Sequence, residues 1–159
     1  MKASPAVCDC CGRSRGFEYA ASFYTRQTPK PTLCPWCIAS GEAAKKYNGK
    51  FSDEHPLRCA DIPEEIIQEV CERNPGFSSW QQEVWQTHCG DACEFHGDVK
   101  RSELRASSKA ALTGLVPLNG MNDSQWQSLL QRYEEGGNPA VYKFVCRHCH
   151  TPIYHLDFT

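Results

Sequence analysis

Two CxxC pairs dominate the start of the sequence, Cys8-Asp9-Cys10-Cys11 and Cys34-Pro35-Trp36-Cys37. Two residues between cysteines allow a tight turn that directs both thiolates at one point, so each pair supplies half of a tetrahedral zinc shell. The pairs are separated by 22 residues (12 through 33), close to the spacing of a zinc ribbon with four cysteine ligands. We therefore predict a first zinc site made of Cys8, Cys11, Cys34 and Cys37.

A third pair, Cys146-Arg147-His148-Cys149, needs a second half-site. The nearest candidate is the CxxxC segment of Cys89 and Cys93, which on a helix end would place both thiolates on one face. We predict a second zinc site made of Cys89, Cys93, Cys146 and Cys149. The pairing is open at the level of sequence because 52 residues (94 through 145) separate the halves. Crossed pairings of the four half-sites, or His88 or His96 as a substitute ligand, are the alternatives.

The number of cysteines favours metal over disulfides. The chain has 11 cysteines in 159 residues, and an odd number cannot pair completely. The first residues resemble no secretory signal, and no stretch reaches the length of about 18 uninterrupted apolar residues that a membrane span needs. We expect a cytoplasmic protein without membrane insertion, in which reducing conditions favour metal binding. Cys10, Cys59 and Cys71 are left over and are expected to be buried or incidental thiols.

Two other readings of the CxxC pairs are weaker. The segment from Cys146 to His150 matches the CxxCH pattern of covalent haem attachment, which requires export. Its flanks, 140–145 and 151–158, instead read as two strands joined by a knuckle. The pair of Cys34 and Cys37 could be a redox motif, but it does not lie in a βαβ unit. We therefore expect neither haem nor a redox centre.

The sequence predicts an α+β fold, with small zinc-ribbon-like β knuckles, several helices and two structural zinc sites. We expect strands over 16–24, 140–145 and 151–158, and helices over 38–47, from 61 to just before Pro75, from the capping-box pattern at Ser79 to Cys89, and over 124–135. Residues 1–50 would form the ribbon and its following helix. Residues 51–159 would form a helical segment closed by a C-terminal β-hairpin zinc knuckle, with both parts packed as one unit.

The predicted metals have a structural rather than a catalytic role. A structural zinc site supplies about 10–16 kcal/mol of apparent binding free energy, which is comparable with the roughly 5–15 kcal/mol net stability of a whole domain. A shell of four thiolates leaves no coordination position for water. The sequence also has neither HExxH nor the HxE signature of zinc deaminases. We therefore expect a protein that is not an enzyme.

Several stretches together resemble the CbrC family, a bacterial zinc-ribbon-like family named for colicin tolerance. The most specific is Pro75-Gly76-Phe77-Ser78-Ser79-Trp80-Gln81-Gln82. The others span Cys8 to Gly16, Leu33 to Gly41, His88 to Phe95 and Phe144 to Cys149. The resemblance covers nearly the whole chain and implies a cytosolic bacterial protein that acts in tolerance or immunity to a bacteriocin or toxin. It supplies no molecular mechanism.

The function that we expect is protein–protein interaction, with a partner such as a bacterial toxin. A formal net charge of −2 disfavours a mainly electrostatic partner such as nucleic acid. The alternative is a nucleic-acid-binding zinc ribbon, because basic and aromatic residues alternate in its segment: Arg13, Arg15, Tyr19, Phe23, Tyr24, Arg26 and Lys30. The pair of Trp80 and Trp85 could be core or partner surface, and the sequence does not identify the partner-binding residues.

Overall fold

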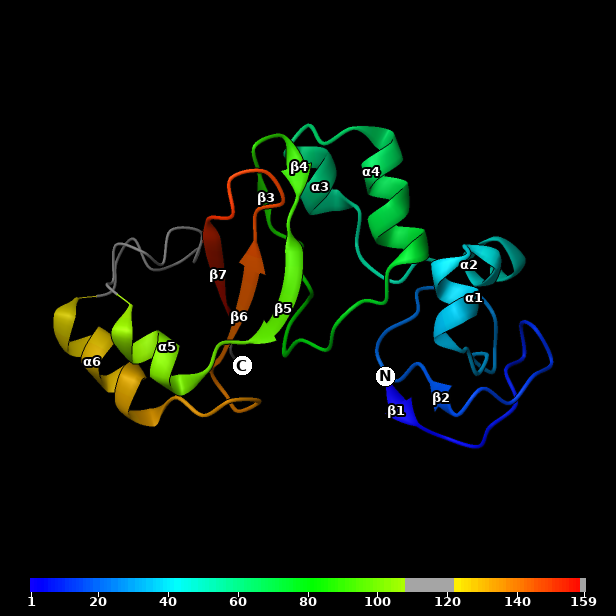
Figure 1. Cartoon of the computed structure of the whole chain (residues 1–159), viewed down its shortest axis with the longest axis horizontal. Coiled ribbons are helices and arrows are strands. Elements are labelled where there is room, and N and C mark those ends of the chain that lie inside the picture. The colour runs from blue at the N-terminus through cyan, green and yellow to red at the C-terminus, as the bar shows by residue number, and fades with distance from the viewer. Residues whose placement is uncertain (108–121, 158–159) are drawn as a thin grey trace. The chain divides into compact units, whose positions relative to one another are not determined.

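A computed structural model describes residues 1–107 and 122–157 of the chain (Figure 1). The predicted α+β class is confirmed, because short helices and small antiparallel sheets alternate along the chain. Two compact units are present: the first comprises Met1–Ser78 with Glu83–Trp85, and the second Ser79–Gln82 with Gln86–Thr159. None of the described helices is long and apolar enough to cross a lipid bilayer.

The first unit consists mainly of short helices around a cysteine-rich core. Its elements are β1 (Lys2–Ala3), β2 (Phe17–Glu18), α1 (Pro35–Ala39), α2 (Glu42–Tyr47), α3 (His55–Cys59), α4 (Glu64–Gln68) and the π-helical turn η1 (Glu69–Arg73). Phe23 and Phe51 stack in the core with ring centroids 4.6 Å apart. Cys8, Cys34 and Cys37 are buried in the same cluster as these rings. The thiols are therefore part of the apolar core.

Backbone conformation shortens several predicted elements of this unit. The helix expected over 38–47 is divided into α1 and α2 at Gly41, which has a left-handed φ of 78°. The next helix begins at Glu64, because Asp61 has a φ of 53° and Pro63 is the residue before the first turn. The strand expected over 16–24 is reduced to Phe17–Glu18. Single residues with positive φ or proline thus interrupt patterns that look continuous in sequence.

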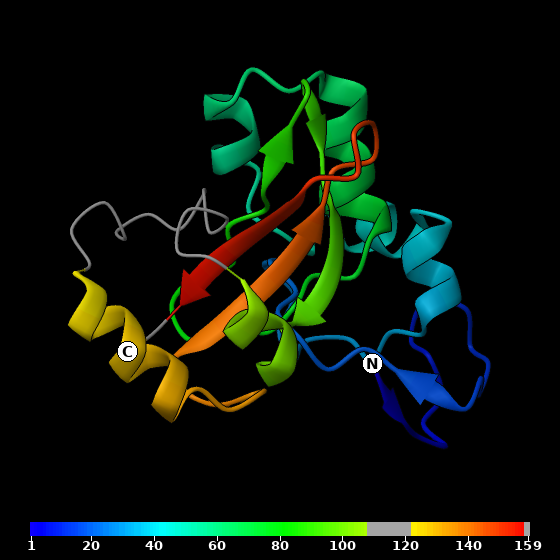
Figure 2. The ribbon, with the colours of Figure 1, turned by 60° about the vertical axis from the view of Figure 1, so that its left-hand side comes forward.

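The second unit contains a three-stranded antiparallel sheet (Figure 2). The unit comprises β3 (Thr87–His88), β4 (Asp91–Ala92), β5 (Glu94–Asp98), α5 (Arg101–Ala106), α6 (Asp123–Arg132), β6 (Ala140–Val145) and β7 (Pro152–Asp157). The sheet order is β5-β6-β7, and β3 and β4 form a separate short hairpin. The pairing of β6 with β7 runs from Ala140 opposite Asp157 to Val145 opposite Pro152. The predicted C-terminal hairpin is therefore confirmed.

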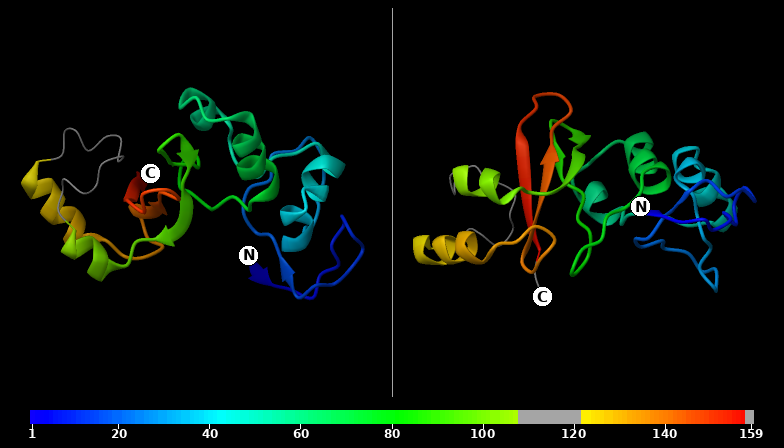
Figure 3. Two further views of the ribbon diagram at one scale, coloured as in Figure 1. Left: turned by 45° about the horizontal axis from the view of Figure 1, so that its top comes forward. Right: turned by 60° about the horizontal axis from the view of Figure 1, so that its bottom comes forward.

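Helices α5 and α6 cover one face of this sheet (Figure 3). Alternate residues of the strands point to that face and pack against the helices. The resulting cluster contains Val99, Leu104, Trp126, Leu129, Tyr133, Val141, Tyr154 and Leu156. A capping box at Asn122 and Gln125 begins α6, where each side chain bonds the backbone N–H of the other residue. Local capping and tertiary packing thus agree over α6, which was predicted over 124–135.

The helix predicted to begin at Ser79 is absent, and residues 79–86 have no regular helix. Two tertiary hydrogen bonds hold this segment instead. The backbone N–H of Trp80 donates to the Asp157 carboxylate at 2.5 Å, and its indole N–H donates to the Gly137 carbonyl at 2.9 Å. Trp85 is buried and contacts the Phe77 ring, with centroids 6.1 Å apart. Trp80 is half exposed.

The first compact unit extends beyond residue 50. Residues 51–73 belong to the first unit because they pack with its helices. The Phe51 N–H donates to the Cys71 carbonyl at 2.7 Å, and both side chains are fully buried. Residues just after position 50 therefore complete the first core.

The buried hydroxyl of Tyr133 tests the core of the second unit. Tyr133 is fully buried and donates to the Val99 carbonyl at 2.5 Å. We expect Tyr133→Phe to lower the free energy of unfolding by about 1–2 kcal/mol, because a buried hydrogen bond is lost. Urea denaturation measures this change. The exposed Gln127 of α6 supplies the control, since Gln127→Ala should change stability by less than about 0.5 kcal/mol. Equal changes in the free energy of unfolding for the two variants would contradict a stabilising role of the Tyr133 hydrogen bond.

Candidate metal centres

The first predicted ligand set comes together in the structure. The Sγ atoms of Cys8, Cys11, Cys34 and Cys37 all lie within 4.8 Å of one another. Sγ of Cys8 is 3.8 Å from Sγ of Cys37, and Sγ of Cys11 is 3.9 Å from Sγ of Cys34. Sulfur atoms at about 2.3 Å from a tetrahedral Zn²⁺ would be about 3.8 Å apart. The four sulfurs therefore have the spacing that a zinc ion requires.

A tight turn and a helix start position these four sulfurs. In the turn, the Gly12 N–H donates to the Cys8 carbonyl at 2.7 Å, and the Cys8 N–H donates to the Arg13 carbonyl at 3.0 Å. Gly12 has a φ of 69°, which suits glycine. Cys34 precedes the first turn of α1, and its backbone N–H lies 3.3 Å from Sγ of Cys8. Backbone donors around the sulfur atoms are typical of metal knuckles.

The electrostatics of the first cluster favour a bound cation. A backbone hydrogen bond from Arg13 lowers the pKa of the Cys11 thiol to about 6. Burial raises the pKa values of Cys34 and Cys37. Burial of several thiolates without a positive charge would be costly, and a divalent ion removes that cost. The site thus has the ligand geometry of a metal centre, and a bound cation would offset the cost of burying thiolates there.

The second cluster differs from the predicted one in a single ligand. It consists of His88, Cys89, Cys146 and Cys149, whose ligand atoms also lie within 4.8 Å of one another. The two thiols of Cys89 and Cys149 are 3.9 Å apart. Nδ1 of His88 lies 3.1 Å from Sγ of Cys89 and 3.3 Å from Sγ of Cys149. Three cysteines and one histidine form a second tetrahedral ligand set.

Cys93, predicted as a ligand, does not join the cluster. The prediction assumed a helix end, where residues four apart share a face. The segment is instead a hairpin whose loop residues, Cys89 and Gly90, have φ values of 52° and 71°, as in a type I′ turn. The Cys93 N–H donates to the Gln86 carbonyl at 2.9 Å. Cys93 is two residues beyond Asp91, which places it about 7 Å farther along the strand and away from the turn. The Cys93 thiol is buried, which raises its pKa to about 12.

The other half of the second cluster repeats the first knuckle. The His150 N–H donates to the Cys146 carbonyl, and the Cys146 N–H donates to the Thr151 carbonyl, both at 3.0 Å. These are the hydrogen bonds that the Cys8 turn makes. His150 takes the place of Gly12 and has a φ of 59°. The histidine of the CxxCH pattern therefore occupies the left-handed position of the turn and lies outside the ligand set.

Asp91 connects the two hairpins that supply the second cluster. It follows the β3–β4 turn, and its side chain is only 11% exposed. One carboxylate oxygen is 2.9 Å from Nε2 of His148, and the other is 3.8 Å from a guanidinium nitrogen of Arg147. Both partners lie between the two cysteines of the opposite knuckle. These contacts hold the turn of Cys89 beside that knuckle, which fixes the ligands relative to one another.

The remaining cysteines and His96 lie outside both clusters. Cys71 is fully buried and Cys10 is half-buried, in accord with the expectation for the extra thiols. Cys59 is exposed, so of the two expected kinds it is an incidental rather than a buried thiol. His96 is exposed and lies 3.4 Å from the Glu94 carboxylate.

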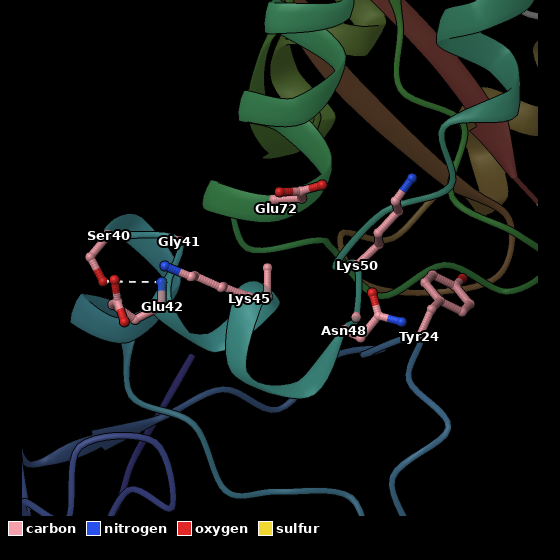
Figure 4. Close-up of a pocket in the computed structure, with 10 residues that line it drawn as sticks. Tyr24, Ser40, Gly41, Glu42, Lys45, Asn48, Lys50 and Glu72 are labelled. Atoms are coloured by element: carbon pink, nitrogen blue, oxygen red, sulfur yellow. Dashed lines mark hydrogen bonds between the residues drawn. The ribbon is translucent and has the colours of Figure 1, made fainter.

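A cavity of about 510 Å³ lies beside α2 (Figure 4). Lys45 and Lys50 line it together with Glu42 and Glu72, so charges of both signs surround it. Its lining contains neither cysteine nor histidine among the residues that the structure describes. The cavity is therefore distinct from the metal clusters.

A protein-family model described as "Uncharacterised protein family (UPF0167)" matches residues 1–158. The chain belongs to this family. The UPF0167 protein PA1536 of Pseudomonas aeruginosa is 46% identical over 160 residues, which covers 100% of this chain and 89% of the relative. The UPF0167 proteins Mb2317 of Mycobacterium bovis and MT2352 of Mycobacterium tuberculosis are each 33% identical over 161 residues, covering 98% of this chain and 84% of the relative. No solved structure matches the chain.

This membership corrects the resemblance to the CbrC family. The matching model and the three relatives named above carry the UPF0167 name, and none of these four carries the CbrC name. A role in colicin tolerance or toxin immunity rested on that resemblance and is withdrawn with it. What holds for this UPF0167 protein is the presence of two clusters that can bind metal ions.

Two substitutions distinguish the ligand sets of the second cluster. We expect His88→Ala to weaken metal binding there by at least about 10–100-fold. Substituting a residue that only hydrogen-bonds to a metal ligand already lowers metal affinity by that factor. Cys93→Ala should retain both metal ions, because Cys93 lies outside the cluster. Metal content after dialysis against a competing chelator measures the difference, and the first cluster serves as internal control. Loss of one ion from Cys93→Ala alone would restore the all-cysteine set.

The left-handed residue of the second knuckle gives a further prediction. We expect His150→Gly to raise the free energy of unfolding by up to about 1 kcal/mol, because glycine adopts positive φ without strain. A valine there should lower it by about 1–2 kcal/mol. Both variants should retain the metal content of the parent, measured by elemental analysis beside urea denaturation. A lost metal ion in His150→Gly would identify His150 as a ligand.

Proposed function

We propose that this UPF0167 protein binds two structural Zn²⁺ ions and acts by binding another protein, without catalytic activity of its own. The observation that carries the proposal is the pair of four-ligand clusters with tetrahedral spacing. Thiolate and imidazole donors suit Zn²⁺, and four protein ligands fill its shell. A filled shell has no position at which water or substrate could be activated. Thiolate clusters also fit a reducing compartment such as the cytoplasm.

Each ion would join segments that are distant in sequence. In the first unit it would link the Cys8 turn to the start of α1. In the second it would link the β3–β4 turn to the β6–β7 knuckle. Binding free energies of about 10–16 kcal/mol per structural zinc match the whole stability of a small domain. The ions would therefore decide whether each unit is folded.

Three of the residues that could favour nucleic acid, Arg15, Tyr19 and Phe23, are used within the first unit. Phe23 is buried, and Tyr19 packs edge-on against Phe51 with centroids 5.2 Å apart. The Arg15 guanidinium lies 5.2 Å from the centroid of the Trp36 ring. With a net charge of −2, these contacts support a protein partner over a phosphate backbone. Trp36 is 47% exposed, and exposed tryptophan and arginine often carry protein–protein contacts.

Metal removal tests the structural role. Native mass spectrometry should find two Zn²⁺ ions per chain. A strong chelator should remove them and abolish the cooperative unfolding transition, because the first cluster lies within a core and the second joins two hairpins. Circular dichroism before and after chelation, and after zinc is restored, measures this change. A metal-free chain with an unchanged transition would contradict a structural role.

Cobalt substitution and a binding assay test the two other parts of the proposal. Co²⁺ in both clusters should give tetrahedral spectra that added cyanide or azide leaves unchanged, since no position is open. A spectral change would indicate an open site and favour an enzyme. A fluorescent oligonucleotide should not bind at micromolar concentration in physiological salt. Binding there would favour the nucleic-acid alternative.

A further inference from the structure

A third pair of metal-ligating side chains lies on α3, outside both clusters. We propose that His55 and Cys59 form a surface site for one borderline-soft divalent ion such as Zn²⁺. The protein would supply two ligands, and water would occupy the remaining coordination positions. This site uses no residue of the two clusters, and counting its ion as a third equivalent rests on their proposed occupation by two zinc ions.

The helix brings the two ligand atoms to the separation that chelation needs. His55 and Cys59 are four residues apart at the two ends of α3, so their side chains share one face. Sγ of Cys59 lies 3.5 Å from Nε2 of His55 and 4.0 Å from Nδ1. A tetrahedral zinc ion bound to one sulfur and one imidazole nitrogen places them about 3.5 Å apart. The backbone therefore needs no change to accept the ion.

The position of the helix start is fixed without the imidazole. A carboxylate oxygen of Asp53 accepts the backbone N–H of His55 at 3.0 Å, and Pro56 occupies the first turn. On the opposite side of the helix axis, Leu57 is fully buried and anchors α3 to the first unit. The short helix is thus held by its backbone and by an apolar side chain. The two ligand side chains are left on its outer face, where both are exposed.

The surrounding charges permit a cation at this place. Arg58 lies between the two ligands in sequence, and its guanidinium is paired with two carboxylates. It donates to Glu64 at 2.8 and 3.0 Å and to Glu54 at 2.9 Å. Glu54 also pairs with Lys50 at 2.6 Å. The positive charges near α3 are balanced by carboxylates, so a divalent ion meets little net repulsion.

Zinc protection of the Cys59 thiol tests the site. The chain is first loaded with two Zn²⁺ per molecule and then treated with iodoacetamide at increasing free Zn²⁺, and peptide mass spectrometry gives the alkylation rate of each cysteine. At a free Zn²⁺ concentration ten times the dissociation constant, the rate at Cys59 should fall about tenfold by mass action. The half-buried thiol of Cys10 is measured in the same sample and should show no such protection.

Substitution of the histidine separates chelation from binding to a thiol alone. In His55→Ala the protection of Cys59 should disappear at the same free Zn²⁺, because one ligand remains. A zinc titration should show a third, weaker equivalent in the parent that is lost in His55→Ala and in Cys59→Ser. His88→Ala should keep the third equivalent, so failure at the second cluster is distinguishable from failure here. Equal protection with and without His55, or no third equivalent, would overturn the proposal.

Discussion

Convergence of four ligand atoms on one point is the constraint on which each unit depends. In the first unit the sulfurs belong to the apolar cluster itself, so the same contacts that bury Phe23 and Ile38 also bring the thiols together. In the second, the ligands come from two hairpins that Asp91 joins through His148. Thiolates so close together repel one another unless a cation lies between them. With metal bound as proposed, folding and metal binding would therefore be a single equilibrium.

The same backbone turn occurs at a CxxC pair in both units. The turns at Cys8 and Cys146 share two hydrogen bonds and a left-handed residue after the second cysteine. Their partners differ, since the start of a helix completes one cluster and a type I′ hairpin completes the other. The knuckle is thus a local structure that the sequence sets within about six residues. The tertiary fold decides which partner reaches it.

This division explains what the sequence could predict. The set at Cys8 and Cys34 was accessible because two CxxC pairs at ribbon spacing leave few alternatives. At the second cluster the CxxxC spacing fits a helix and so favours Cys93 over His88 as the ligand, whereas the structure has a hairpin there. The sequence feature that indicates this hairpin is the dipeptide Cys89-Gly90, because glycine is suited to the positive φ of a two-residue turn. The helix expected at Ser79 failed for another reason, because Asp157 and Gly137 accept hydrogen bonds that local patterns cannot reveal.

The two clusters differ in contact with solvent. Three of the four ligands are buried in the first, and three of the four are exposed in the second. Ions leave such shells by stepwise attack of competing donors, which need access to the ligand atoms. Under the proposed zinc binding, the second cluster would therefore exchange its ion faster than the first. When zinc is scarce, such a chain would pass through a half-loaded species in which the first cluster keeps its ion and the second is empty.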